Sequence, residues 1–240
     1  TKLAGSIASG ALDEVSKIVK PGISTDLIDR ICYEYINDNK AYSAPLFYRG
    51  FPKSCCTSAN HVVCHGIPSD KILKDGDIVN VDVTAFKDNW HGDTSRMFKI
   101  GEVSIKAEKL IKTTYESMMK AINIVKDGLY LGDIGSTIQT HVEEQGFSVV
   151  QDFCGHGIGQ SFHKEPNILH YGEKGTGEKI KAGMIVTIEP MINVGNYETK
   201  TLNDGWTAVT KDKSLSAQFE HTIGVTKDGC EIFTLSSKIT

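Results

Sequence analysis

Residues 77–98 read D-I-V-N-V-D-V-T-A-F-K-D-N-W-H-G-D-T-S-R-M-F. In the first part of this stretch valines alternate with polar residues, and this two-residue period predicts a strand with one apolar and one polar face. Asp82 lies on the polar face. Lys87, Asp88 and Asn89 favour a turn, after which the chain can return as the second strand of a hairpin.

The two carboxylates of this stretch are expected to be neighbours. A turn centred on Lys87 and Asp88 pairs Asp82 with Asp93, and paired side chains on one face of a hairpin have Cβ atoms about 4.5–5.5 Å apart. Carboxylates this close repel each other unless a proton or a cation lies between them. The stretch therefore suggests a metal site. A helix, which would also bring both Asp onto one face, and a hairpin with two solvated Asp are the alternatives.

The composition is that of an ordinary globular protein, with 240 residues, of which 40% are hydrophobic and 23% charged. This length fits one large domain or two small ones. A formal net charge of −4 predicts neither a nucleic-acid partner nor binding to an anionic membrane surface. We therefore expect small or neutral partners.

Six Cys occur without a CxxC pair, so we interpret them as reduced thiols and expect a cytoplasmic protein. No apolar run approaches the roughly 20 residues of a membrane span, and the N-terminus lacks a signal-peptide pattern. The sequence begins at Thr1 inside a helical pattern, so we expect further residues before it.

Apolar residues recur at helical spacing in four segments, at 3–19, 27–36, 110–125 and 134–142. Pro-Gly and Asp-Gly turns end the first and third of these, and Thr25 is placed to cap the second. Residues 44–68 are expected to be loop-rich. The order of helix, helix, loop and strand pair then occurs a second time.

The repetition can be followed along the sequence. V-K-P-G-I at 19–23 matches V-K-D-G-L at 125–129, and L-K-D-G-D-I-V-N-V-D at 73–82 matches I-K-A-G-M-I-V-T-I-E at 180–189. This makes Asp82 and Glu189 equivalent positions, and H-G-I-P at 65–68 likewise resembles H-K-E-P at 163–166. We expect one α+β catalytic domain over 1–240. It would consist of two pseudo-symmetric halves, about 1–105 and 106–240, that share one antiparallel sheet with helices on its outside.

Three more residues join the two Asp as candidate ligands. His156 lies in a glycine-rich loop, where a lone His is more often structural, although glycines let other groups approach closely. Glu189 ends an apolar strand before Pro190, and Glu220 lies in another strand pattern. Because a buried acid without a partner is costly, carboxylates at these positions favour a shared cation. Four carboxylates and one imidazole suit two Co, Mn, Fe or Zn ions.

At these residues the sequence resembles the type I methionine aminopeptidases, which have the pita-bread fold, and the resemblance covers essentially the whole chain. Its motifs are V-C-H-G-I-P (63–68), D-G-D-I-V-N-V-D-V-T (75–84), H-G-D-T-S-R-M-F (91–98), F-C-G-H-G-I-G (153–159), F-H-K-E-P (162–166), T-I-E-P-M (187–191), D-G-W-T (204–207) and S-A-Q-F-E-H-T (216–222).

The resemblance implies a role for each site residue. The metal ligands would be Asp82, Asp93, His156, Glu189 and Glu220, with Asp93 and Glu220 bridging two divalent ions. The catalytic residues would be His65, His163 and Glu189, and the substrate pocket would contain Tyr48, Phe51, Cys56, His65, Phe162, His163 and Trp206. Asn60, Val62 and Ser216 match positions that hold a monovalent cation in some relatives. His61 and Lys164 depart from the family pattern, at places where an acid is common.

The implied activity is removal of the initiator methionine from nascent proteins and peptides, with a small second residue preferred. The implied partners are peptides and nascent chains that begin with Met, and the question of ribosome binding stays open. We expect a monomer. The alternatives are a proline-directed aminopeptidase or prolidase of the same fold, which usually carries an extra N-terminal domain, and a non-catalytic relative that binds ligands. Loss of one ligand would indicate the last of these, and here the set is complete.

Overall fold

The computed structural model describes residues 1–236. Its helices are α1 (Lys2–Ile18), α2 (Thr25–Asp38), α3 (Ile105–Ile124) and α4 (Leu131–Glu144), together with a short 3-10 helix, η1 (Tyr48–Gly50). The four α-helices are the four helical segments expected from the sequence. Among the described residues, no helix has the length and apolarity needed to cross a bilayer.

The strands of the first half are β1 (Tyr42–Ser43), β2 (Cys56–Ala59), β3 (Val62–Cys64), β4 (Ile78–Lys87) and β5 (Trp90–Lys99). Those of the second half are β6 (Ser148–Val149), β7 (Gly155–Gly157), β8 (Lys164–Ile168), β9 (Ile185–Ile188), β10 (Met191–Asn193), β11 (Thr199–Thr201), β12 (Ala208–Thr210), β13 (Ser216–Gln218), β14 (Glu220–Val225) and β15 (Cys230–Ile232). Strands β2 and β3 lie in the segment expected to be loop-rich, so that prediction was wrong for part of 44–68.

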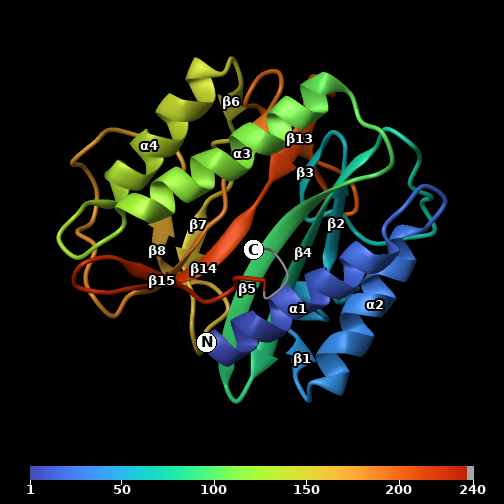
Figure 1. The fold of residues 1–240 in the computed structure, drawn as a ribbon, viewed down its shortest axis with the longest axis horizontal. Coiled ribbons are helices and arrows are strands. Elements are labelled where there is room, and N and C mark those ends of the chain that lie inside the picture. Colours follow the sequence, from blue (N-terminus) through green and yellow to red (C-terminus); the bar gives the residue numbers. More distant parts are fainter. Residues whose placement is uncertain (237–240) are drawn as a thin grey trace.

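The main sheet has nine antiparallel strands in the order β1-β4-β5-β14-β9-β7-β8, with β2 paired to β4 and β15 to β14. Two three-stranded sheets, β13-β10-β6 and β11-β12-β3, accompany it. In Figure 1 the helices cover one side of the main sheet, α1 and α2 near β4 and β5, and α3 and α4 near β14 and β8. The predicted α+β class is confirmed, and strands from both ends of the chain meet at the β5–β14 pair.

The tip of the β4–β5 hairpin differs from the predicted turn. Lys87 pairs with Trp90, so the turn consists of Asp88 and Asn89, with φ values of 50° and 67°. A two-residue hairpin turn of this kind needs a positive φ at both central residues, and Asp and Asn tolerate this conformation better than Lys does. The turn is therefore one residue later than the sequence analysis placed it.

This shift changes which side chains pair. Asp82 pairs with Ser95, and Asp93 pairs with Thr84, so the two carboxylates are diagonal neighbours instead of directly opposite each other. Diagonal neighbours in a sheet are roughly 7–8 Å apart. Because the pairing moved by two residues, both Asp remain on the predicted face. The predicted direct pairing of Asp82 with Asp93 was thus wrong, while their common face was right.

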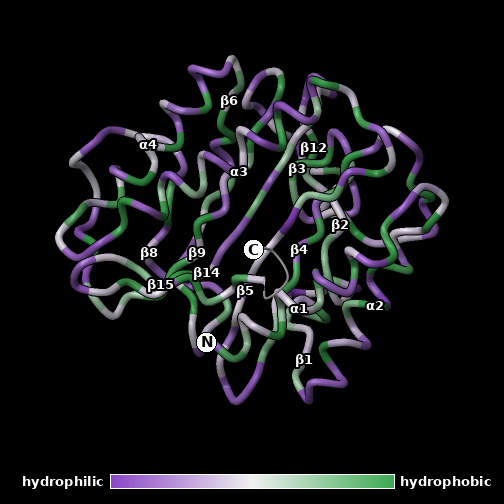
Figure 2. Tube along the Cα trace, in the orientation of Figure 1, coloured by the Kyte–Doolittle hydropathy of each residue, from purple (hydrophilic) through white to green (hydrophobic). Residues whose placement is uncertain are grey.

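The opposite face of β4 forms a core with the first two helices. Val79, Val81 and Val83 are fully buried in a cluster with Leu12 of α1 and Ile28 of α2. Burying a side chain of this size contributes roughly 1.5–3 kcal/mol. Figure 2 shows the result as apolar segments along the central strands and a hydrophilic hairpin tip. The alternation read from the sequence therefore separates a helix-packed face from the face that carries Asp82.

Helix α1 lies unusually close to β5. A Cβ atom on Gly92 would be 2.2 Å from the backbone nitrogen of Gly5, so a side chain at Gly92 would push the helix away. Arg96, which points to the same side, forms an ion pair with the buried Asp13 of α1, with 3.0 Å between Nη1 and Oδ1. These contacts fix α1 on the hairpin that carries the two Asp.

The cap of α2 also differs from the prediction. Ser24, which has extended backbone angles, accepts a hydrogen bond from the Leu27 N–H and is the N-cap. Thr25 is the first helical residue, and its hydroxyl donates to the carbonyl of Ser69 instead. The predicted cap at Thr25 was thus one residue too late, and the contact of Thr25 with Ser69 gives its hydroxyl another role.

Candidate metal centre and substrate cavity

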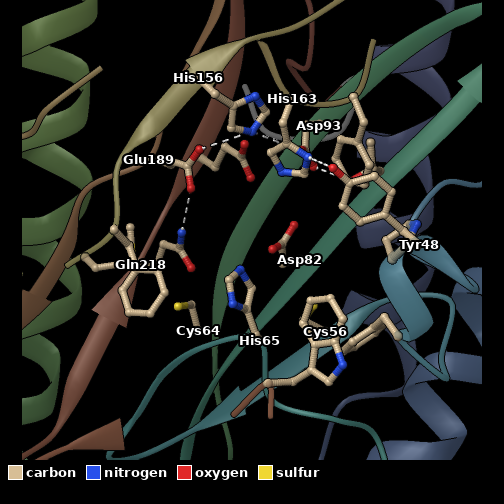
Figure 3. Close-up of a pocket in the computed structure, with 18 of the residues that line it drawn as sticks. Tyr48, Cys56, Cys64, His65, Asp82, Asp93, His156, His163, Glu189 and Gln218 are labelled. Carbon is tan, nitrogen blue, oxygen red and sulfur yellow. Dashed lines mark hydrogen bonds and ion pairs between the residues drawn. The ribbon is translucent and has the colours of Figure 1, made fainter. Parts of the chain in front are cut away.

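The polar face of the main sheet forms one wall of a cavity of about 420 Å³. All five predicted metal ligands line it, with Asp82 from β4, Asp93 from β5, His156 from β7, Glu189 just after β9 and Glu220 from β14. The remaining predicted residues that line it are Tyr48, Phe51, Cys56, His65, Phe162, His163 and Trp206. Figure 3 shows Asp82, Asp93, His156 and Glu189 facing a common space. The structure thus brings together residues separated by up to 172 positions, from Tyr48 to Glu220.

The tightest group within this cavity contains Asp93, His156 and Glu220, each of which offers one ligand atom within 4.8 Å of the others. All three side chains are buried. The Nε2 atom of His156 is 3.8 Å from Oδ2 of Asp93 and 3.6 Å from Oε1 of Glu189. Three strands of the sheet and the residue that follows a fourth therefore converge on this imidazole nitrogen.

The hydrogen bonding of His156 decides the state of that nitrogen. Nδ1 lies 3.1 Å from the carbonyl oxygen of Gly157, and because a carbonyl accepts only, Nδ1 must carry the proton. Burial lowers the pKa of His156 to about 4, so the ring is neutral at pH 7 and Nε2 bears a lone pair. A lone pair and carboxylate oxygens then face each other, and such a group of acceptors calls for a cation.

The pKa values of the carboxyl groups also indicate that the site needs a cation. Burial raises the pKa of Asp82 to about 7, and burial together with the charge of Asp82 raises the pKa of Glu189 to about 8. Burial and neighbouring carboxylates raise the pKa of Asp93 and of Glu220 well above the ordinary range. Four acids in one buried site cannot all ionise unless positive charge compensates them.

A divalent cation fits this donor set. Oε1 of Glu220 is buried and has no hydrogen-bond partner among the described residues, so a ligand oxygen is free. Oxygen ligands with one imidazole suit Mn, Fe, Co or Zn, and carboxylates that are costly when unpaired become favourable when they share a cation. The residues present could hold such ions, with Asp82, Asp93, His156, Glu189 and Glu220 as the candidate ligands.

His156 lies in a strand, not in the glycine loop that the sequence suggested. Gly155 and Gly157 flank it in β7, which pairs with β8 and β9. A Cβ atom on Gly155 would lie 2.5 Å from the carbonyl oxygen of Thr187 in β9. Glycine at this position lets β7 approach β9 and brings the imidazole to the acids. The same composition that resembled a loop is what permits close strand packing.

Aromatic side chains form the opposite part of the cavity. The ring centroids of Tyr48 and Phe162 are 4.9 Å apart, and those of Phe51 and Trp206 are 5.2 Å apart, with the latter pair nearly perpendicular. Cys56 adds a buried thiol to this wall. Aromatic rings and a thiol make an apolar pocket that accepts a flexible, polarisable side chain.

Two further His lie between the acids and the aromatic wall. His163 is accessible to solvent, and its Nδ1 is 3.0 Å from the hydroxyl oxygen of Tyr48. The enclosed part of the ring and the neighbouring His156 lower the pKa of His163 to about 3, so it is neutral at pH 7. His65 packs edge-on against Trp206 in a backbone conformation with a φ of 57°, which non-glycine residues seldom adopt. Strained backbone of this kind often occurs at functional sites.

The three candidates for a monovalent cation lie near each other, outside the cavity lining. The backbone N–H of Ser216 donates to the carbonyl of Asn60 at 2.8 Å, and Val62 begins β3. The hydroxyl oxygen of Ser216 is buried without a hydrogen-bond partner among the described residues. The side-chain oxygen of Asn60, however, already accepts the N–H of Ile78. Of the oxygens in this group, the Ser216 hydroxyl is the one without a hydrogen-bond partner among the described residues, since the Asn60 carbonyl accepts the Ser216 N–H.

Several residues around the site were not predicted from the sequence. Thr84 donates to Oδ1 of Asp93 at 2.6 Å, Gln218 donates to Oε2 of Glu189 at 3.3 Å, and Nε2 of His170 accepts the N–H of Glu189. Other unpredicted residues of the lining are Pro45, Arg49, Cys64, Asp152, Phe153, Cys154 and Met191. Residues two positions apart in a strand share a face. This spacing could have indicated Thr84, two residues after Asp82, and Gln218, two residues before Glu220. No local signal indicates His170.

The sheet, the buried acids and the imidazole define a metal-binding protein with an apolar pocket beside the metal site. The profile of Metallopeptidase family M24 matches residues 1–227. A methionine aminopeptidase from Rickettsia prowazekii (strain Madrid E) is 58% identical over 238 residues, which are 99% of this chain and 92% of that protein. The chain therefore belongs to metallopeptidase family M24.

Solved structures agree with this assignment. The crystal structure of methionine aminopeptidase from Rickettsia prowazekii has a TM-score of 0.96 and 57% identity, covering 98% of this chain and 95% of that one. A prolidase from Pyrococcus furiosus has a TM-score of 0.78 at 21% identity, covering 99% of this chain but 63% of that one. The second match extends to the fold alone. Together they confirm the pita-bread fold.

Proposed function

We propose that this protein removes the N-terminal methionine from nascent proteins and peptides, with a preference for a small second residue. One observation carries the proposal: a chain closely similar to methionine aminopeptidases has its buried acid–imidazole group and an apolar aromatic pocket in a single cavity. The pocket would hold the methionine side chain, and the acids would hold two divalent ions, with Asp93 and Glu220 as the bridging pair. Mn, Fe, Co and Zn all suit these ligands.

The ions, when bound, supply Lewis acidity that polarises a peptide carbonyl and lowers the pKa of water. The protein's own groups would then move protons. Glu189, which a bound cation would keep ionised, would accept a proton and return it to the departing amine. This role is in addition to its role as a ligand, because its two oxygens can act separately.

His163 is suited to stabilise charge on the scissile carbonyl oxygen. In the tautomer in which the Tyr48 hydroxyl donates to Nδ1, the proton of the neutral ring is on Nε2, which then is a donor. A donor aimed at developing negative charge typically contributes about 10²–10³ in kcat. His65, which the repeat relates to His163, would contact the amide nitrogen from the other side of the peptide.

Specificity would follow from the shape of the cavity. Tyr48, Phe51, Cys56, Phe162 and Trp206 would enclose the first side chain and exclude water from it. The same rings would limit the space beyond this pocket, so a large second residue would be excluded. His61 and Lys164, which are not among the residues that line the cavity, would tune the preference for charge further along the peptide.

The remaining expectations are part of the same proposal. Residues 1–240 would form one catalytic domain with halves at about 1–105 and 106–240, the last four residues lying outside the described part of the chain. Equivalent hydrogen bonds support the repeat: Gly22 N–H donates to the Leu73 carbonyl at 2.8 Å, and Gly128 N–H to the Ile180 carbonyl at 2.9 Å. We also propose that the protein is a monomer and that it is cytoplasmic. Its six free thiols are consistent with a reducing compartment.

A monovalent cation held near Asn60, Val62 and Ser216 is a further part of the proposal, supported by the buried Ser216 hydroxyl that lacks a partner among the described residues. Peptides and nascent chains beginning with Met would be the substrates. Binding to the ribosome, where such chains emerge, would place the enzyme near them.

The test is release of free methionine from short peptides by the protein supplied with Mn²⁺. Met-Ala-Ser should be cleaved at least about tenfold faster than Met-Lys-Ser, which corresponds to roughly 1.4 kcal/mol in the transition state. Equal rates would contradict the proposed pocket. Cleavage of X-Pro peptides in preference to Met-Ala-Ser would indicate a proline-directed peptidase, and absence of any cleavage with metal bound would indicate a binding relative.

A further inference from the structure

Thr187 of β9 contacts two candidate metal ligands at once. Its hydroxyl oxygen accepts the backbone N–H of His156 at 2.9 Å and lies 2.7 Å from Oε1 of Glu189. The side chain is fully buried. A threonine hydroxyl has one hydrogen and two lone pairs, so accepting from His156 leaves its hydrogen for another partner.

Two acceptors compete for that hydrogen. Oε1 of Glu189 is 2.7 Å away, while the carbonyl oxygen of His156 is 3.5 Å away, at the limit of a hydrogen bond. The hydroxyl therefore donates to Glu189. When a bound cation keeps Glu189 ionised, this bond is charge-assisted and of the stronger kind.

The bond to His156 replaces part of the sheet ladder. Strands β7 and β9 pair at a single position, Gly157 with Val186, so the N–H of His156 has no carbonyl opposite it in β9. Thr187 supplies the acceptor with its side chain instead. Removal of the hydroxyl would leave a buried N–H unsatisfied on the residue that carries the imidazole ligand.

Glu189 is held at its other atoms by separate groups. Nε2 of Gln218 donates to Oε2, and the backbone N–H of Glu189 donates to Nε2 of the buried His170. Figure 3 shows Glu189 with contacts to both Gln218 and His156. Among these groups that hydrogen-bond to Glu189, the Thr187 hydroxyl is the one that also hydrogen-bonds to a second candidate ligand, His156.

We propose that Thr187 is a positioning residue that couples His156 to Glu189 and so sets the geometry of the metal site. Through it, a displacement of β7 is transmitted to the carboxylate after β9, and the two ligands keep a fixed separation before any ion arrives. Partners of this kind, which hydrogen-bond to ligands, typically change metal affinity or activity by about 10–100-fold when they are removed. This inference rests on the proposed metal-dependent function.

The variant Thr187→Val keeps the branched shape and removes the hydroxyl, and Thr187→Ser keeps the hydroxyl. Thr114→Val is the matched control, because Thr114 is equally buried and its hydroxyl donates to the Leu110 carbonyl within α3, away from the cavity. Metal-free proteins are titrated with Mn²⁺ by calorimetry, and methionine release is then measured with saturating Mn²⁺. Thermal unfolding establishes that each variant is folded.

We expect Thr187→Val to bind Mn²⁺ at least about tenfold more weakly than the original protein and to lose kcat with little change in KM. Thr187→Ser and Thr114→Val should bind Mn²⁺ within about threefold of it. If Thr187→Val does not fold, Thr187→Ala provides the same comparison without the added methyl group.

Unchanged Mn²⁺ affinity in a folded Thr187→Val or Thr187→Ala protein would overturn the inference. So would a Thr187→Ser protein as defective as Thr187→Val, since keeping the hydroxyl would then not preserve the metal site. If the original protein itself bound no Mn²⁺, the proposed function would fail first, and the titration distinguishes these outcomes.

Discussion

The raised carboxyl pKa values predict that metal affinity increases strongly with pH. Asp82, with a pKa near 7, is about one-tenth ionised at pH 6 and about nine-tenths ionised at pH 8, and Glu189, with a pKa near 8, rises from about one-hundredth to about one-half. A cation binds the ionised forms, so protons must leave as it enters. With the two carboxyls treated as independent, affinity should increase by about two to three orders of magnitude between pH 6 and pH 8, or roughly 4 kcal/mol.

Metal affinity rises with pH, and does not fall, because the pKa values of the carboxyl ligands are raised. Raised carboxyl pKa values keep protons on the ligands in the metal-free protein, so lower pH opposes metal binding. His156, with a pKa of about 4, is neutral throughout this range and contributes no pH dependence. Asp93 and Glu220 have pKa values raised well above the ordinary range, so their protons can only add to the effect.

Calorimetric titration with Mn²⁺ at pH 6, 7 and 8 measures this directly. Repeating it in buffers with different ionisation enthalpies counts the protons released. The variant Asp82→Asn, which has no proton to release at this position, should release about one proton fewer at pH 6. An affinity that changes less than about tenfold over this range, with no proton release, would refute the assignment of buried, protonated ligands.

Three more results are expected. Asp93→Ala should lose both ions and nearly all activity, while Asp82→Ala should weaken mainly one site; two full-affinity sites in a calorimetric titration of Asp93→Ala would contradict the bridging role. His163→Ala should keep its metal content and lose about 10²–10⁴ in kcat, whereas His156→Ala should bind metal poorly and recover partly in excess cation; reversed metal stoichiometries would exchange the two roles. The metal-free protein should lose roughly 4 kcal/mol of unfolding free energy from pH 6 to pH 8, because acids with raised folded-state pKa values contribute stability below their unfolded pKa and lose it as pH rises through the folded-state pKa. Denaturant unfolding at both pH values measures this, and a flat profile would argue against the raised pKa values.

Much of the fold could be predicted because its local signals agree with its packing. The alternation in β4 identified both faces of the hairpin, since Val81 is fully buried against the helices while Asp82 lines the cavity. The four helices were indicated by apolar spacing, since each covers one side of the sheet. The repeat in the sequence also related Asp82 to Glu189, and both residues line the cavity.

The two incorrect predictions, of the hairpin register and of a loop at His156, also have physical causes. The hairpin register depends on which two residues adopt a positive φ, and Lys87, Asp88 and Asn89 are all acceptable turn formers in a sequence pattern. The strand at His156 was missed because its glycines have no strand propensity of their own and are present to permit contact with Thr187. Tertiary packing decided both.

The residues that support the ligands were the hardest to foresee. Thr187 and Gln218 occur at strand positions where Thr and Gln are ordinary residues, and His170 is distant from the acids in sequence. Their roles depend on hydrogen bonds between separate strands, so only the assembled sheet reveals them. The candidate ligands could be proposed from the sequence because acids at strand positions that are expected to be buried are uncommon.

If the proposed function is right, this cavity releases methionine only when the acid–imidazole group holds divalent ions. The most direct measurement removes metal with a chelator, dialyses the chelator away, and follows free methionine from Met-Ala-Ser while Mn²⁺ is returned in known equivalents, with bound metal determined in parallel. We predict no measurable release without metal and a rate that rises with bound Mn²⁺ until the site is filled. Full activity in protein shown to contain no metal would contradict the account.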